Sequence, residues 1–176
     1  ERFDVIRRSS SAGREFLKQM STKTLMDYTV LISSPQILTR LPGIGSRIGI
    51  HIAAPGLAIA HGSPLDGIAR ARLSTVYMPG NKITMLPEAV VDGYTLAGGV
   101  DCPAVSLYLT VDDSYEILAS ESRLEMVHIA ANLRHHDVEP WFNADTVGGP
   151  LPDMPFKDEL LHLWHFANAC EGRRGK

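Results

Sequence analysis

Hydrophobic and polar side chains alternate in the segment SRIGIHIAAP (46–55). Ile48, Ile50 and Ile52 fall at every second position, so an extended chain would place them on one face. Polar or small residues lie between them and would occupy the opposite face. This alternation predicts a strand with one buried face, and the preceding sequence LPGIG (41–45) predicts a turn.

A β-hairpin is predicted further along the chain. Apolar side chains alternate with polar ones or with Tyr108 over residues 105–111. The sequence DDS (112–114) consists of turn-forming residues, and a return strand can follow it as far as Ile129. Another strand is expected over YTVLI (28–32), because β-branched and aromatic residues are enriched in strands.

Helix signals begin in GSPLDGIARARL (62–73). Ser63 is a residue type that caps helices, a proline follows it at the first helical position, and Asp66 lies where a capping acid belongs. Apolar side chains then recur at helical spacing. Pro79 disfavours helical geometry in the residue before it, so we expect this helix to end near Tyr77.

Three further helices are expected. A short one can start at Ser11, a second lies near residues 135–145, and the last spans residues 157–171. The apolar face of the last helix is formed by Leu160, Leu163, Trp164 and Ala167. The elements do not alternate as βαβ units. We therefore predict an α/β fold of the α+β-like kind, with a mixed, largely antiparallel sheet and flanking helices.

The 176 residues are 44% hydrophobic and 21% charged, which is typical of a globular domain with its own core. No apolar run approaches the roughly 20 residues that span a membrane. The predicted core consists of Ile48, Ile50, Ile52, Leu65, Ile68, Leu107, Leu109 and Trp164. Cys102 and Cys170 lack the spacing of metal ligands, so we expect free thiols and a cytoplasmic location.

Charge is unevenly distributed along the chain. Residues 1–50 carry eight Lys/Arg against four Asp/Glu, a balance of +4, whereas residues 51–176 carry nine against sixteen, a balance of −7. A free-standing nucleic-acid module usually presents a basic face. The larger part of this chain does not show one in net terms.

Two kinds of motif have the composition of a functional site but are better explained as turns. Asp112 and Asp113 are adjacent carboxylates, which can hold a divalent metal. Their place at a hairpin tip favours a turn, because Asp tolerates turn geometry and forms hydrogen bonds with nearby backbone groups.

The glycines of LPGIG and LAGGV (96–100) lack the spacing of a phosphate-binding loop. No pattern marks a catalytic triad.

The histidines do not predict a metal site. His135 and His136 are adjacent, so their side chains diverge on a helix or a strand, and His128 lies across an element boundary. A catalytic zinc needs three protein ligands from convergent positions. A metal hydrolase using His135 and His136 is an alternative that stoichiometric zinc would reveal. His162 and His165 lie three apart on the last helix, where we expect a solvated polar face.

Four short motifs follow one another through the middle of the chain: IAAP (52–55), GSPLD (62–66), TVYMP (75–79) and MLP (85–87). On these motifs, residues 41–176 resemble part of the catalytic RNB domain of the ribonuclease II family. The resemblance implies a processive exoribonuclease ancestry, in which RNA is hydrolysed from its 3′ end with Mg²⁺.

The resemblance also implies a role for Tyr77. In the family, the tyrosine of the TVYMP-like motif stacks on a base close to the scissile phosphate. A ring held by the rigid bend Met78-Pro79-Gly80 offers a flat surface at little entropic cost. Base stacking on an aromatic ring contributes roughly 1–3 kcal/mol and accepts any base. Without the resemblance, a half-buried core tyrosine is the simpler interpretation.

The chain departs from the family where the metal is held. The family's chemistry rests on four aspartates that bind magnesium, which activates water and stabilises the leaving oxygen. By spacing from Pro42, the corresponding positions hold Leu25, Leu31, Ser33 and Ser34. None of these is acidic, and Asp27 alone cannot replace them. We therefore expect no catalytic residues and no bound metal in this chain.

The resulting hypothesis divides the chain into residues 1–40, without family resemblance, and a partial RNB domain at residues 41–176. We interpret it as a fragment of a ribonuclease II-type exoribonuclease, a family that hydrolyses single-stranded RNA with Mg²⁺, and we expect it to be inactive alone. Its expected partner is single-stranded RNA, not a membrane. The alternative is a non-catalytic binding or regulatory module built on a relic of the RNB fold.

Overall fold

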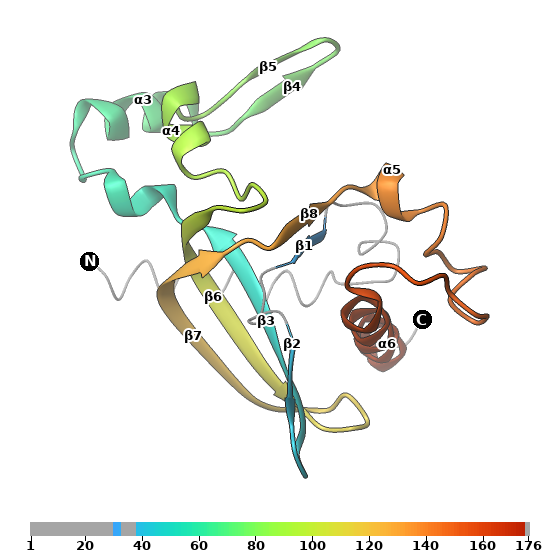
Figure 1. Ribbon diagram of the computed structural model, residues 1–176. Helices are drawn as coiled ribbons and strands as arrows, with labels where there is room; N and C mark the ends of the chain where they lie inside the picture. Colours follow the sequence, from blue (N-terminus) through green and yellow to red (C-terminus); the bar gives the residue numbers. More distant parts are fainter. Residues whose placement is uncertain (1–29, 33–37, 175–176) are drawn as a thin grey trace.

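A computed structural model describes residues 30–32 and 38–174 of the chain. Its centre is a four-stranded antiparallel sheet in the order β2-β3-β6-β7 (Figure 1). The strands are β2 (Leu38–Leu41), β3 (Gly45–Ala53), β6 (Asp101–Val111) and β7 (Ile117–His128). Helix α6 (Lys157–Arg173) packs on one face of this sheet through Leu163, Phe166 and Ala167.

The remaining elements form smaller units. The strand pairs are β1 (Val30–Ile32) with β8 (Ala131–Leu133), and β4 (Val76–Met78) with β5 (Asn81–Ile83). The short helical segments are η1 (Pro55–Ala58), α3 (Pro64–Arg72), α4 (Glu88–Gly93) and α5 (His135–Val138). In Figure 1, α3, α4 and the β4–β5 hairpin lie beyond one end of the central sheet. The predicted α/β class, with a largely antiparallel sheet and flanking helices, is confirmed.

Strands β3 and β6 bring the alternating apolar residues together. Ile48 lies opposite Leu109, and Ile50 lies opposite Leu107, so both strands present these side chains on one face. That face packs against α6, and Ile48 and Leu109 are completely buried there. The predicted strand and the predicted hairpin are therefore both confirmed.

The predicted core is correct at its centre and wrong at two positions. The buried or half-buried members are Ile48, Ile50, Leu65, Leu107, Leu109 and Trp164. Ile52 and Ile68 are 41% and 39% exposed, respectively. Ile52 lies on the correct face of β3, but the core cluster under α6 does not extend to it. Ile68 is exposed because α3 packs on the rest of the described chain too loosely to bury any of its residues.

Helix α3 ends earlier than predicted. Its last residue is Arg72, and Leu73 leaves the helix with a positive φ of 64°. The expected continuation to Tyr77 is wrong, because Tyr77 lies in β4. Pro79 does not follow a helix but begins the tight turn to β5, in which Gly80 has a φ of 75° that suits glycine.

One glycine is required by close packing at the start of β3. Gly45 has a φ of 135°, and a Cβ atom there would lie 2.2 Å from the carbonyl oxygen of Val111. The β2–β3 turn can therefore approach the end of β6 only if no side chain is present at this position.

Several predictions fall partly or wholly outside the described residues. The helix expected from Ser11 and the positions Ser33 and Ser34 lie outside them. The strand predicted at residues 28–32 is described only as β1, and the helix predicted near residues 135–145 is shortened to α5. Within the described ranges, no helix is long and apolar enough to cross a membrane.

Truncations on β3 should distinguish the core from its margin. Ile48→Ala should lower the free energy of unfolding by about 2–5 kcal/mol, because Ile48 is completely buried between β6 and α6. Ile52→Ala, on the same face but 41% exposed, should cost about 1 kcal/mol or less. Urea unfolding followed by circular dichroism measures both changes. Equal losses in the two variants would contradict this placement of the core.

Candidate functional site

Tyr77 lies on an exposed hairpin. Its side chain is 79% exposed on β4, and Lys82 of β5 lies directly opposite it. The residues Pro79 and Gly80 form the turn between the two strands. In Figure 1 this hairpin projects from the group formed with α3 and α4. Tyr77 is therefore a surface residue and not part of the core.

The hairpin is anchored at its base. The guanidinium of Arg72, at the end of α3, donates a hydrogen bond to the carbonyl oxygen of Thr84 at 2.9 Å. The N–H of Met85 donates to Oγ1 of Thr75 at 3.2 Å, which joins the two ends of the hairpin. Leu86, which follows, is buried. The exposed tip thus projects from a fixed base.

Helix α3, which carries this base, is capped as predicted. Ser63 Oγ accepts a hydrogen bond from the N–H of Asp66 at 3.2 Å. The Asp66 carboxylate accepts bonds from the N–H of Gly62 at 2.8 Å and from Nε of Arg70 at 2.9 Å. The bond from Gly62, followed by that from Arg70, lowers the pKa of Asp66. The GSPLD motif therefore encodes a stable helix start beside the hairpin.

An exposed aromatic ring on an anchored hairpin can receive the flat face of another ring. Stacking of a nucleobase on such a ring contributes roughly 1–3 kcal/mol and requires no particular hydrogen-bond pattern. The geometry around Tyr77 is therefore compatible with the role that the motif resemblance implies for it.

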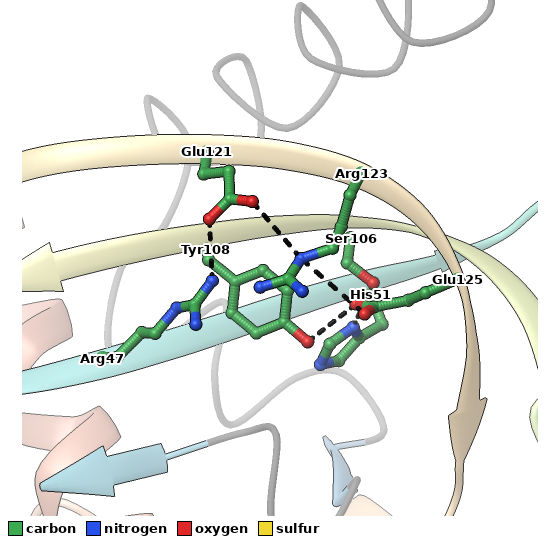
Figure 2. A network of polar contacts seen from close by, with 7 residues as sticks. All are labelled: Arg47, His51, Ser106, Tyr108, Glu121, Arg123 and Glu125. Carbon is green, nitrogen blue, oxygen red and sulfur yellow. Dashed lines mark hydrogen bonds and ion pairs between the residues drawn. The ribbon is translucent and has the colours of Figure 1, made fainter. Parts of the chain in front are cut away.

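A second group of polar side chains lies on the sheet face opposite α6 (Figure 2). The Tyr108 ring lies between two guanidinium groups, with the Cζ atoms of Arg47 and Arg123 at 4.0 and 4.5 Å from its centroid. Glu121 pairs with Arg47 at 2.9 Å and with Arg123 at 3.6 Å. Two cations on one ring repel each other, and the Glu121 carboxylate offsets that repulsion.

His51 and Glu125 complete this polar network. Nδ1 of His51 lies 2.7 Å from Oγ of Ser106, and the Tyr108 hydroxyl donates to Glu125 at 2.7 Å. Burial lowers the pKa of His51 to about 4, although Glu125 opposes the shift. Burial, followed by the bond to Glu125, raises the pKa of Tyr108 to about 12. Burial acts to raise the pKa of Glu125, but bonds from Ser106 and Tyr108 outweigh it and lower that pKa.

The centre of this polar network is enclosed. Ser106 is completely buried and Tyr108 is 5% exposed, so neither can reach a substrate. The alternation on β3 places Arg47 and His51 on the polar face, but their partners come from β6 and β7. Nothing in the local sequence pairs residues so far apart, which is why sequence reasoning missed the network.

His162 corrects another expectation. It is 5% exposed and not solvated, and its Nε2 lies 2.7 Å from Oγ of Ser46 on β3. The Tyr115 ring packs on it with 5.1 Å between ring centroids. Burial, followed by the positive charge of Arg40, lowers the pKa of His162 to about 4. His165 is exposed, as expected. The side of α6 that faces the sheet therefore includes the polar residue His162 as well as the apolar residues, because Ser46 can form a hydrogen bond with it.

Two other candidate metal ligands each lie beside a single carboxylate. His128 pairs with Asp101 at 2.7 Å, and His136 pairs with Asp137 at 3.3 Å. Among residues 30–32 and 38–174, no group of three or more His, Cys, Asp or Glu side chains could hold a metal ion.

Asp112 has the turn role predicted for it. Its Oδ1 accepts hydrogen bonds from the hydroxyl and N–H of Ser114 and from the N–H of Glu116, at 2.8–2.9 Å. These bonds, the Ser114 hydroxyl first, lower the pKa of Asp112. Cys102 and Cys170 are free thiols, also as predicted.

Known proteins are similar to this chain in sequence. The family model of the RNB domain matches residues 21–176 and so begins before residue 41, where the motif resemblance was expected to start. An exoribonuclease 2 of Serratia proteamaculans is 33% identical over 168 residues, which cover 93% of this chain and 25% of that enzyme.

Solved structures share the fold. The chain superimposes on RNase R of Mycoplasma genitalium, solved with ribose-methylated single-stranded RNA, with a TM-score of 0.65 and 15% identity over 84% of this chain and 22% of that one. Yeast Ssd1, a pseudonuclease, gives a TM-score of 0.62 and 18% identity over 85% of this chain and 18% of that one. At these identities the likeness concerns the fold alone. This chain spans a quarter or less of the length of each protein compared.

One buried and one half-buried histidine, His162 and His51, should make stability sensitive to acid. The pKa values of His51 and His162 fall from an ordinary 6.5 to about 4 in the folded chain. Between these values the unfolded chain binds protons that the folded chain does not, so stability should decrease as the pH falls from 6.5 towards 4. Urea unfolding at neutral pH and near pH 5 should give free energies that differ by on the order of 1 kcal/mol or more.

The variant His162→Gln provides the control. Its amide can still bond to Ser46 but does not titrate, so this variant should lose less stability on acidification than the natural chain. If both proteins lose the same amount, His162 is not the buried, neutral group described above.

Proposed function

This chain belongs to the RNB domain family, and we propose that it binds single-stranded RNA through Tyr77 without hydrolysing it alone. The observation that carries the proposal is the 79% exposure of Tyr77 on the anchored β4–β5 hairpin, within the TVYMP motif. A ring held in this way suits stacking on bases of any identity, which an enzyme family acting along RNA without sequence preference requires.

Relatives support RNA as the ligand. RNase R of Mycoplasma genitalium has been solved in complexes with single-stranded and with double-stranded RNA. We place the RNA-binding part of this chain within residues 41–176, where the four motifs lie. We also propose the cytoplasm as its location, because its two cysteines are free thiols.

The metal chemistry of the family does not transfer to the residues of this chain. RNB exoribonucleases use a divalent metal ion, and carboxylates are the ligands that hard cations such as Mg²⁺ prefer. The corresponding positions are occupied by Leu25, Leu31, Ser33 and Ser34. Their side chains provide two hydroxyls and no charged oxygen, so the donor set does not fit Mg²⁺. Yeast Ssd1, a pseudonuclease, has a similar fold, so the fold by itself does not imply hydrolysis.

A non-catalytic module that binds a protein partner is the second candidate. The observation that favours it is the charge balance of −7 over residues 51–176, because an acidic surface repels RNA phosphates. The two candidates differ in whether the isolated chain binds RNA at all.

Removal of the Tyr77 ring should weaken RNA binding and leave the fold intact. Tyr77→Ala should reduce the affinity for a labelled oligouridylate by roughly 1–3 kcal/mol, because the stacking surface is lost. Tyr77→Phe keeps the flat ring and should bind like the natural chain. Fluorescence anisotropy measures the affinities, and urea unfolding should show nearly unchanged stability because the ring is 79% exposed. Unchanged binding by Tyr77→Ala would overturn the proposal.

The chain alone should not shorten RNA. A 3′-terminal exonuclease assay on a 5′-labelled oligonucleotide with added Mg²⁺ should leave the substrate intact, because the four positions above offer no carboxylate. An active ribonuclease II-type enzyme run on the same substrate provides the positive control. Progressive shortening that EDTA abolishes would show that other residues of the chain hold the metal.

A further inference from the structure

We propose that Lys82 binds a backbone phosphate of the same RNA strand whose base stacks on Tyr77, so that the hairpin holds base and backbone together. This inference rests on the proposed function and adds a second binding residue of different chemistry. Tyr77 would supply stacking, and Lys82 would supply charge.

The hairpin register places both side chains on one face. Tyr77 lies directly opposite Lys82, and side chains directly opposite each other in an antiparallel pair point the same way, with Cβ atoms about 4.5–5.5 Å apart. The neighbouring pairs, Val76 with Ile83 and Met78 with Asn81, occupy the other face. One face of the hairpin thus combines an aromatic ring with a cation.

Of the three cationic side chains in residues 62–87, Lys82 is the one without a described interaction partner for its charged group. Arg70 is paired with Asp66 at 2.9 Å, and Arg72 is bound to the carbonyl oxygen of Thr84 at 2.9 Å. Lys82 is exposed, and in the described ranges its ammonium group has neither an ion-pair partner nor a ring contact. It can therefore bind an anion without breaking an existing interaction.

Within residues 51–176, the local charge favours RNA at this hairpin. Residues 62–87 carry three Lys/Arg against one Asp/Glu, a balance of +2, whereas residues 88–176 carry six against fifteen, a balance of −9. Phosphates are repelled by the acidic part and attracted to the segment that carries Tyr77. The net acidity of the chain is therefore compatible with one local site for a polyanion.

The chemistry of Lys82 suits a contact that does not read sequence. A lysine ammonium is a point charge on a flexible stem, and phosphate is the same group at every nucleotide. The backbone N–H of Lys82 donates a hydrogen bond to Oδ1 of Asn81 at 2.8 Å. This bond helps to fix the backbone from which the lysine side chain extends. Together with a ring that accepts any base, this predicts affinity without base preference.

Salt dependence separates the two contributions. For single-stranded nucleic acid, each phosphate contact contributes about 0.7 to the slope of log affinity against log salt. Lys82→Gln should weaken binding to a labelled oligouridylate at low salt and reduce that slope by about 0.7. Tyr77→Ala should weaken binding at every salt concentration and leave the slope unchanged. The same pattern should hold for oligoadenylate.

A charge-preserving control tests position. The double variant Asn81→Lys/Lys82→Asn keeps the net charge but moves the ammonium group to the opposite face of the hairpin, so it should bind as weakly as Lys82→Gln. Two results would overturn the role of Lys82: an affinity of the double variant equal to that of the natural chain, or a salt slope of Lys82→Gln equal to that of the natural chain. If Tyr77→Ala still binds RNA more weakly in that case, the role of Tyr77 is unaffected. If Tyr77→Ala has no effect, the proposed function fails as well.

Discussion

The pairing of β3 with β6 determines where the rest of the chain can lie. Its register runs from Ser46 opposite Val111 to Ala53 opposite Ala104, and it sorts the side chains of both strands into two faces. One face is apolar and receives α6, and the other places Tyr108 between two arginines. Because the side-chain period of a strand is two, a slip by one residue would exchange these faces and bring charged groups against α6.

The same pairing brings together the two ends of the segment that carries the candidate site. The N–H of Ala54 donates to the carbonyl oxygen of Pro103 at 3.0 Å, directly beyond the last pair of the ladder. The chain therefore leaves the sheet and returns to it at one point. Everything between, from η1 through α3 and the β4–β5 hairpin to α4, is an insertion between adjacent strands. A binding tip on such an insertion can be exposed without opening the core.

Sequence reasoning succeeded where one local rule decides the outcome. Alternation identified the strand of Ile48, and the cap residues identified the start of α3. It failed where the answer depends on distant partners, as for Ile52, which lies beyond the cover of α6, and for His162, which is buried because Ser46 lies opposite it. The motif resemblance implied a stacking role for Tyr77. The pairing of Lys82 with Tyr77 depends on the hairpin register, and the helix expected to end near Tyr77 did not predict that register.

The contact between Gly45 and the end of β6 bears on how this chain can evolve. Gly45 has no side chain to offer a ligand, yet any Cβ atom there would collide with the backbone of Val111, 2.2 Å away. Exchange at this position disturbs the strand pair on which the inserted segment depends, whereas exchange at Tyr77 leaves that pair untouched. Selection for folding and selection for binding therefore act on different residues. A lineage released from RNA binding would be expected to keep Gly45 and to lose Tyr77.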